Sequence, residues 1–171
     1  MREILFKAKA INRDKGYHRT EYKNGDWVYG LVTRLYDERF ENLPAEMTNT
    51  SGISGIEVDY KTIGQFTGLT DKNGRKIFEG DIFKFPDEIW ESSYTSCDTE
   101  WDSWETENYG VVGFDEYYAR FDFDQYKYNE NSVEADLHEN NCLEFASFVK
   151  ELEIVGNIHD NPELLKGETN D

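Results

Sequence analysis

The chain has 171 residues, of which 15% are aromatic, and its 36 acidic and 18 basic side chains give a formal net charge of -18. The length suits one or two small domains with a buried core, and the aromatic content argues against a fully disordered chain. The negative charge argues against direct binding of nucleic acid or of an anionic membrane through most of the surface.

The net charge is concentrated in one part of the chain. Residues 86–145 hold 17 Asp or Glu and 2 Lys or Arg, which gives -15, whereas the rest of the chain carries -3. A field of this sign favours partners with a basic surface. It is also compatible with a role in solubility alone.

The cysteine pattern and the lack of long apolar segments bear on the cellular compartment in which the protein is expected. Cys97 and Cys142 form neither a CxxC motif nor a Cys/His ligand set. The sequence has no signal-peptide pattern and no apolar run of about 20 residues. We therefore expect a protein of a reducing cytoplasm that does not enter a membrane.

The N-terminal part is predicted to contain two strands. Residues 1–10 alternate between apolar and polar side chains, which predicts a half-buried strand. The apolar positions are Ile4, Phe6, Ala8 and Ala10, and the basic ones are Lys7 and Lys9. After a polar loop at 12–26, residues 27–32 are almost entirely apolar and predict a more fully buried strand. The segment 24–30 reads NGDWVYG.

The next part has a weaker pattern. Residues 37–55 contain Pro44 and a run rich in Thr, Ser, Gly and Asn, which predicts a mobile loop. Residues 56–60 alternate again and predict a short strand.

The clearest turn signals lie in the centre, where residues 66–85 read FTGLTDKNGRKIFEGDIFKF. Residues 71–74 predict a tight turn, because Asp accepts local backbone hydrogen bonds and Asn-Gly tolerates positive φ. Apolar residues flank Glu79-Gly80-Asp81, where the glycine predicts a bulge or a bend. We expect a hairpin followed by a strongly bent strand, as in a small barrel.

The same segment partly resembles a calcium-binding EF-hand loop, in which Asp71 and Asn73 occupy the first two ligand positions. The likeness then fails, because Arg75 replaces an oxygen ligand, Lys76 replaces the glycine and Ile82 replaces the bidentate Glu. We predict a hairpin without a metal ion.

Residues 86–109 combine eight acidic residues with several aromatic ones and contain no Lys or Arg. Pro86 is expected to end the preceding strand, and the segment is predicted to be a loop whose aromatic side chains fold back onto the domain. The alternative is an exposed surface for a partner, because aromatic residues supply much of the energy of interfaces and carboxylates attract basic partners. The residues assigned to partner binding are Trp90, Asp98, Glu100, Trp101, Asp102, Trp104, Glu105 and Glu107.

The C-terminal third is predicted to contain both strands and a helix. The expected elements are strands at 110–114, 119–124 and 152–158, a turn at 115–116, a helix at 132–150 and a short helical turn at 161–162. We also expect that residues 66–85 and 152–158 are neighbours in one sheet system.

Three segments resemble motifs of the YopX family of phage and prophage proteins. They are NGDWVYG at 24–30, the central segment 66–85, and LEIVGNIHDNPELL at 152–165. The resemblance implies a mainly β fold, with a β-rich N-terminal region at 1–63, an SH3-like barrel at 64–165 and a tail at 166–171. It leaves residues 86–109 as an insertion and implies no catalytic residue, cofactor or substrate.

No motif of a known catalytic class is present. His18, His138 and His159 form no HExxH or Cys/His arrangement, and the P-loop and GxSxG patterns are absent. We expect a non-catalytic module without a cofactor that binds a basic protein surface in a bacterial host; a homo-oligomer is an additional option. The alternative is an acidic protein that mimics nucleic acid and inhibits a host nucleic-acid-binding or defence protein.

Overall fold

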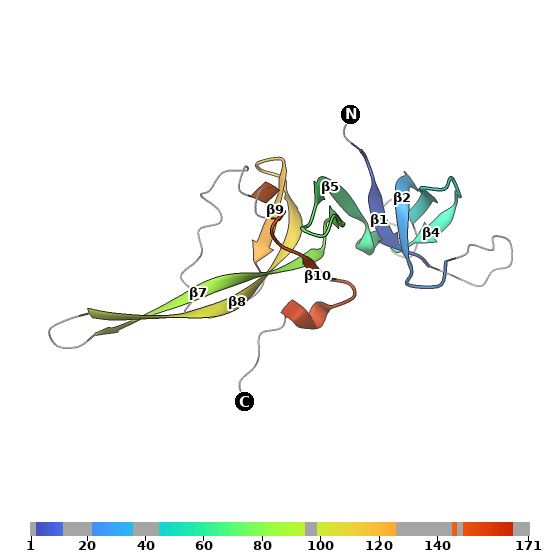
Figure 1. Ribbon diagram of the computed structural model, residues 1–171. Coiled ribbons are helices and arrows are strands. Elements are labelled where there is room, and N and C mark those ends of the chain that lie inside the picture. Colours follow the sequence, from blue (N-terminus) through green and yellow to red (C-terminus); the bar gives the residue numbers. More distant parts are fainter. Residues whose placement is uncertain are drawn as a thin grey trace. The chain divides into compact units, whose positions relative to one another are not determined.

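The protein is mainly β, with two antiparallel sheets and little helix (Figure 1). The computed structural model describes residues 3–11, 22–35, 45–94, 99–125, 145–146 and 149–165; at 85–94, 99–106, 108, 124 and 125 it describes the backbone alone. The chain divides into two units, residues 1–68 and 69–171, and each unit has its own hydrophobic core.

The first unit is built on antiparallel strands in the order β4-β3-β2-β1-β5. Their bounds are β1 (Phe6–Lys9), β2 (Trp27–Arg34), β3 (Ala45–Asn49), β4 (Ile56–Val58) and β5 (Gly64–Thr70). The 3-10 turn η1 (Tyr60–Thr62) connects β4 to β5 and is capped by the Asp59 carboxylate, which accepts the Lys61 N–H at 3.0 Å. β5 continues into the second unit, where β6 (Lys76–Phe78) follows it in the sheet.

Alternate side chains of these strands form the core of the first unit. Its buried residues are Ala8, Ala10, Val28, Ala45, Met47, Ile56 and Val58. Apolar residues at every second position fit a sheet that is covered on one face. The strands predicted from alternation, within 1–10 and at 56–60, are confirmed as β1 and β4.

The predictions for residues 37–55 and for the burial of β2 are wrong in this unit. Residues 45–49 form β3 instead of a loop, because their side chains alternate in burial and their backbone pairs with both β2 and β4. β2 is half-buried, since Val28 is in the core whereas Tyr29 is 42% and Leu31 is 51% exposed. A run of apolar residues does not by itself distinguish a strand buried on two faces from a strand buried on one.

Lys7 and Ile4 also depart from the predicted faces of β1. Alternation predicts an exposed Lys7, but the residue is 5% exposed and its ammonium lies 4.7 Å from the centre of the Trp27 ring. The aromatic ring attracts the cation and packs against the aliphatic part of the side chain. Ile4 precedes β1 and is 64% exposed, so it does not join the core.

The second unit contains a four-stranded antiparallel sheet in the order β10-β7-β8-β9. Its strands are β7 (Asp81–Tyr94), β8 (Thr99–Asp115), β9 (Arg120–Gln125) and β10 (Ile154–Asn157), and the 3-10 turn η2 (Pro162–Leu165) follows them. Its core residues are Ile77, Phe83, Val112, Phe123, Val149 and Ile154. The pairing of β10 with residues 81–83 of β7 confirms that the central segment, residues 66–85, meets the closing motif, residues 152–165, in one sheet.

The described part of the acidic segment, residues 86–94 and 99–109, belongs to this sheet and does not form the predicted loop. β7 and β8 stay paired without a bulge from Ile82 opposite Val111 to Tyr94 opposite Thr99. The predicted end of a strand at Pro86 is therefore wrong, as is the predicted start of a strand at residue 110. Proline is tolerated in a strand where its missing N–H faces an open edge, and Pro86 lies beyond the residues that β10 pairs.

The remaining expectations have different outcomes. The turn after Asp115 and the helical turn from Pro162 are confirmed. The helix expected at 132–150 falls largely outside the described residues, as do both cysteines; Phe145 and Ala146 are helical. Among the described strands, β9 and β10 lie at opposite edges of the sheet and do not pair, so the SH3-like barrel stays a prediction.

The two units differ in charge. The first has 10 Lys or Arg and 10 Asp or Glu, whereas the second has 8 and 26, so the whole net charge of -18 belongs to residues 69–171.

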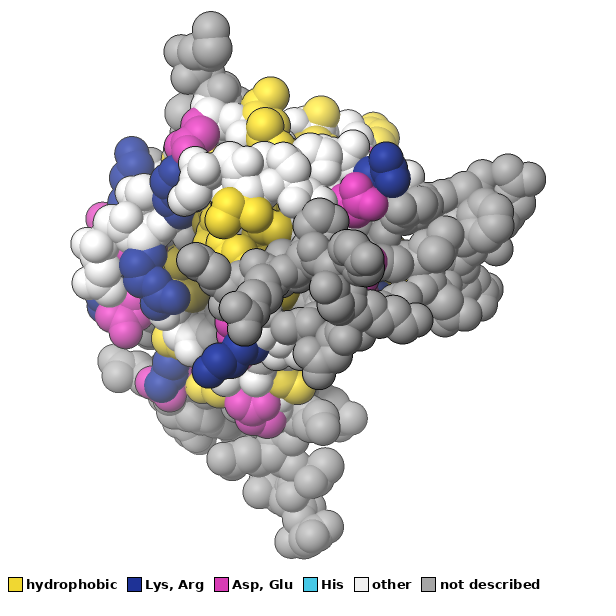
Figure 2. Space-filling view, turned by 90° about the vertical axis from the view of Figure 1, so that its right-hand side faces the viewer, with side chains coloured by type: hydrophobic (Ala, Val, Ile, Leu, Met, Phe, Trp, Pro, Cys, Tyr) yellow, Lys and Arg dark blue, Asp and Glu magenta, His cyan; other side chains and the backbone are white. Residues whose placement is uncertain are grey.

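The face drawn in Figure 2 carries exposed hydrophobic side chains together with both basic and acidic ones. Within the described ranges, no helix has the length and apolarity needed to cross a membrane.

Candidate functional site

The candidate site is the part of the second sheet that β7 and β8 form alone, residues 84–94 and 99–109, which we call the ribbon. β10 pairs with β7 at 81–83, and β9 pairs with β8 at 110–115. No third described strand pairs with the ribbon, and Figure 1 shows its two strands continuing side by side beyond β9 and β10. A two-stranded ribbon has two faces, and successive residues along each strand belong alternately to one face and to the other.

The register divides the ribbon residues between these two faces. Directly opposite residues share a face, and their neighbours along the strand belong to the other face. Trp90 is opposite Ser103 and Trp101 is opposite Ser92, so these two tryptophans are diagonal neighbours on one face. Trp104 is opposite Ile89 and belongs to the other face.

Acidic residues also occupy opposite positions across the ribbon. Glu88 is opposite Glu105, and Glu91 is opposite Asp102. Like charges in directly opposite positions destabilise a strand pair, so the stability of the ribbon does not explain these residues. A basic surface bound to the ribbon would offset their repulsion.

A salt bridge lies at the base of the ribbon. Lys84 Nζ is 2.6 Å from Glu107 Oε2, and the Glu107 side chain is 64% exposed. The hydrogen bond with Glu107 raises the pKa of Lys84 above its usual value of 10.5. Glu107 therefore has an internal partner, which weakens its assignment to partner binding.

The ribbon brings together most of the residues that the sequence assigned to partner binding. Those on its strands are Trp90, Glu100, Trp101, Asp102, Trp104, Glu105 and Glu107, and Asp98 lies outside the described residues. Their register separates them into two sets. One face has Trp90, Trp101, Glu105 and Glu107, and the other has Glu100, Asp102 and Trp104. Their role in binding stays a prediction.

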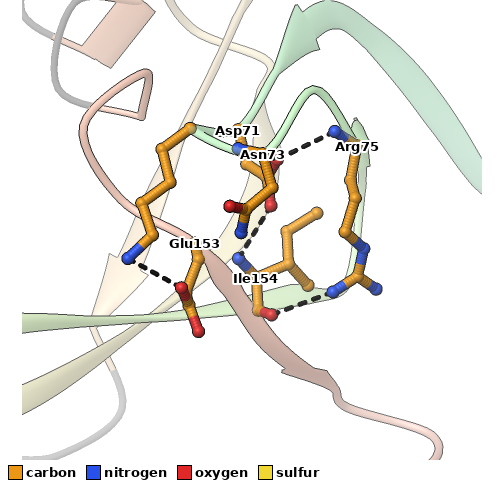
Figure 3. Close-up of polar contacts among 6 residues, drawn as sticks. Asp71, Asn73, Arg75, Glu153 and Ile154 are labelled. Atoms are coloured by element: carbon orange, nitrogen blue, oxygen red, sulfur yellow. Dashed lines mark hydrogen bonds and ion pairs between the residues drawn. The ribbon is translucent and has the colours of Figure 1, made fainter.

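The loop of the central motif holds the edge of the sheet at β10 (Figure 3). Asp71 Oδ1 accepts the backbone N–H groups of Asn73 at 2.9 Å and Arg75 at 2.8 Å, which forms the predicted turn. Asp71 Oδ2 accepts the Ile154 N–H of β10 at 3.3 Å, and Arg75 Nη1 donates to the Ile154 carbonyl at 3.1 Å. The loop thereby satisfies backbone groups at an edge of the sheet.

A second pair of residues strengthens the same contact. Lys72 Nζ lies 2.7 Å from Glu153 Oε2, and the Lys72 backbone N–H donates to the Leu152 carbonyl at 2.9 Å. The hydrogen bond with Lys72 lowers the pKa of Glu153 below its usual value of 4.5. Backbone and side-chain contacts therefore both tie the central turn to the closing motif.

A buried contact joins the start of β7 to the end of β10. Asp81 and Asn157 are 3% and 5% exposed, and Asn157 Nδ2 donates to Asp81 Oδ1 at 3.1 Å. Asp81 Oδ2 accepts the Phe78 N–H at 2.8 Å, and Asn157 Oδ1 accepts the His159 N–H at 3.0 Å. The sequence analysis did not predict this pair, although Asp81 lies in the central segment and Asn157 lies in the closing motif. The contact fixes the turn from β6 into β7.

The carboxylates of these motifs are used in hydrogen bonds within the protein. Both oxygens of Asp71 and both oxygens of Asp81 accept such bonds. Within the described residues, no group of three His, Cys, Asp or Glu is placed to hold a metal ion. The geometry of Asp71 is therefore that of a turn residue.

The sequence that forms these contacts also matches a known protein family. The family model described as YopX protein matches residues 23–166. The chain belongs to the YopX family. The range matched by the YopX model contains the three motifs and also the ribbon.

The other comparisons add no activity to this YopX protein. It is similar to the crystal structure of protein EF1440 from Enterococcus faecalis, with 22% identity, 96% of this chain and 99% of that chain covered, and a TM-score of 0.45. A comparison with curated proteins found no match.

Proposed function

We propose that the ribbon is a docking arm through which this YopX-family protein binds a protein partner with a basic surface, without catalysing a reaction. The observation that carries the proposal is the pairing of β7 with β8 over residues 85–94 and 99–109, which carry seven carboxylates and no basic residue. Its negative field would accelerate encounter with a cationic surface and repel phosphate. Direct binding of nucleic acid is therefore not part of the proposal.

Aromatic residues supply the proposed anchors of the complex. Trp90 and Trp101 are diagonal neighbours on one face of the ribbon, and Tyr94, opposite Thr99, belongs to the same face. Large aromatic side chains contribute much of the energy of protein interfaces, and surrounding charged groups set the encounter rate and the orientation. We therefore assign the centre of the contact to this face.

The sheet supports the proposal by giving the ribbon a fixed base. Phe83 of β7 and Val112 of β8 are at most 1% exposed and belong to the core of the second unit. The contact of Asp81 with Asn157 holds the start of β7. A binding element with a preorganised base loses less conformational entropy when it binds.

Mimicry of nucleic acid is a second candidate, in which the ribbon would block the basic cleft of a host nuclease or defence protein. The number of acidic residues favours it. Mimicry predicts carboxylates along one face, whereas the register distributes them over both. One face has Asp87, Glu91, Glu100 and Asp102, and the other has Glu88, Glu105 and Glu107. This distribution favours the more general docking arm.

Four further parts of the proposal come from the YopX resemblance or from composition. They are a phage or prophage origin, action in the cytoplasm of a bacterial host, closure of residues 64–165 into an SH3-like barrel, and self-association. Sedimentation of the purified protein tests the last of these. An experimental structure that resolves residues 126–144 tests the barrel, because it shows whether strand pairing closes the sheet.

The docking arm can be tested by co-purification from nuclease-treated host extract. The ribbon variant carries Glu88→Gln, Glu105→Gln and Glu107→Gln, which lie on the face of Trp90 and Trp101. The matched control carries Glu3→Gln, Glu57→Gln and Glu151→Gln. Both variants lose three negative charges. We expect wild type and control to retain a partner that the ribbon variant loses and that high salt releases. Equal retention by all three proteins would contradict the proposal, and a nucleic-acid-binding partner would favour mimicry.

A further inference from the structure

A second exposed surface lies at the turn that connects β8 to β9, residues 114–121, which we call the aromatic turn. Tyr117 is 88%, Tyr118 is 58% and Phe114 is 46% exposed. Single exposed apolar residues are common, whereas a group of them marks an interaction surface. β8 begins at the far end of the ribbon and ends at this turn, so the two surfaces are separate.

Local contacts hold the rings of the aromatic turn in position. Asp115 Oδ1 accepts the N–H groups of Tyr117 at 2.8 Å and Tyr118 at 3.1 Å. The two rings meet edge to face, with 4.8 Å between their centres. The Arg120 guanidinium lies 4.9 Å from the centre of the Tyr118 ring, and its Nη2 donates to Asp122 Oδ2 at 2.8 Å. These contacts restrict the backbone and the rings before binding, which reduces the entropy that they lose on contact.

The backbone of the aromatic turn is strained at Ala119. Its φ is 51°, in the left-handed region, which glycine adopts more readily than alanine. In the rest of the described chain, every residue with positive φ is a glycine. Strain of this kind persists where the surrounding structure imposes a particular geometry, and it is common at binding sites.

We propose that the aromatic turn inserts into an apolar pocket of a partner protein whose rim carries Lys or Arg side chains. Tyr117 is suited to enter a pocket, because 88% of it is exposed. Asp115 and Glu116 directly precede it, in a unit with a net charge of -18. This charge attracts a cationic rim and repels nucleic acid, and it also repels a second copy of the same unit.

The test captures the occupant and then measures its affinity. A photoreactive benzoylphenylalanine replaces Tyr117 in the full-length protein, in the organism that encodes it, and mass spectrometry identifies the cross-linked protein. That protein is then purified and titrated against wild type by calorimetry. We expect Tyr117→Ser to weaken binding about tenfold or more, as for an interface anchor. Tyr117→Phe should retain the affinity, because the ring is the proposed contact.

Tyr60→Ser is the matched control, since Tyr60 is 46% exposed and lies in the first unit. We expect it to change the affinity by less than about twofold. Glu116→Gln should weaken binding and reduce its salt dependence. The proposal is overturned if no protein is captured, if only nucleic acid or a second copy of the chain is captured, or if Tyr117→Ser binds as tightly as wild type.

Discussion

Asn157 donates a side-chain hydrogen bond to Asp81, 76 positions earlier in the sequence, and the two residues are 5% and 3% exposed. The bond joins the end of β10 to the start of β7. A buried carboxylate is stable where its oxygens accept hydrogen bonds and costly where a donor is lost. This contact between the central and closing motifs is therefore structural, and it orients the base of the ribbon.

Removal of this hydrogen bond should destabilise the second unit. Asn157→Ala takes one donor from a buried carboxylate, so we expect a loss of about 1.5–3 kcal/mol in the free energy of unfolding. Urea unfolding followed by circular dichroism measures it. The control Glu151→Ala, at an exposed position of the same unit, should cost less than about 0.5 kcal/mol. Equal losses for the two variants would show that the hydrogen bond between Asn157 and Asp81 adds no stability beyond that of an exposed side chain.

The two glycines of NGDWVYG should respond differently to substitution. A Cβ at Gly30 would lie 1.9 Å from the Thr48 carbonyl oxygen and 2.8 Å from Asn49 Cα, so Gly30→Ala should cost about 1–3 kcal/mol or more. Gly25 has open space around it but a φ of 87°, which Asn tolerates better than Ala. Gly25→Asn should therefore be more stable than Gly25→Ala. Gly30→Asn should be no more stable than Gly30→Ala, because the clash at position 30 is steric. Thermal unfolding of the four variants checks both statements.

The salt bridge of Glu153 with Lys72 should contribute to stability above acidic pH. The lowered pKa of Glu153 means that folding favours its ionised form. Its contribution is present above the usual value of 4.5 and is lost as the pH falls through the lower value in the folded protein. The difference in Tm between wild type and Glu153→Gln should therefore be largest near neutral pH and shrink below pH 4.5. A difference that grows as the pH falls would contradict this assignment.

Local turn chemistry could be predicted from the sequence because it depends on neighbouring residues. The Asp71 turn and the turn from β6 into β7 formed where Asp, Asn and Gly indicated them, and Gly74 and Gly80 have φ values of 78° and 79°. The contact of Asp81 with Asn157 could not be found in this way, since no local pattern reports which polar residues of two distant motifs will meet.

The ribbon shows the same limit for strands. Its residues carry so many charges and a proline that they lack the apolar alternation of a half-buried strand, yet β7 and β8 pair through all of them. The pairing begins in the core of the second unit, where Phe83 of β7 and Val112 of β8 are buried, and it extends from there along both strands. The sequence could indicate the composition of the candidate site, but the division of Trp90 and Trp104 between two faces follows from register alone.

The ribbon should be separable from the rest of the fold. Asn-Gly in place of residues 88–105 would join Asp87 to Thr106, which are directly opposite, by a two-residue hairpin loop. β10 and β9 pair outside this range, and a two-stranded ribbon adds little stability of its own. We expect cooperative unfolding with a similar Tm by differential scanning calorimetry. Loss of cooperativity would show that the ribbon residues belong to the core.

The most direct test of the docking arm uses this ribbon-deleted protein. A partner retained by wild type in co-purification is purified and titrated by calorimetry against wild type, the ribbon-deleted protein and the control with Glu3, Glu57 and Glu151 neutralised. The docking arm predicts that wild type and control bind with affinities within about twofold of each other and that the folded, ribbon-deleted protein shows no binding. Binding of the ribbon-deleted protein with the affinity of wild type would contradict the proposed function.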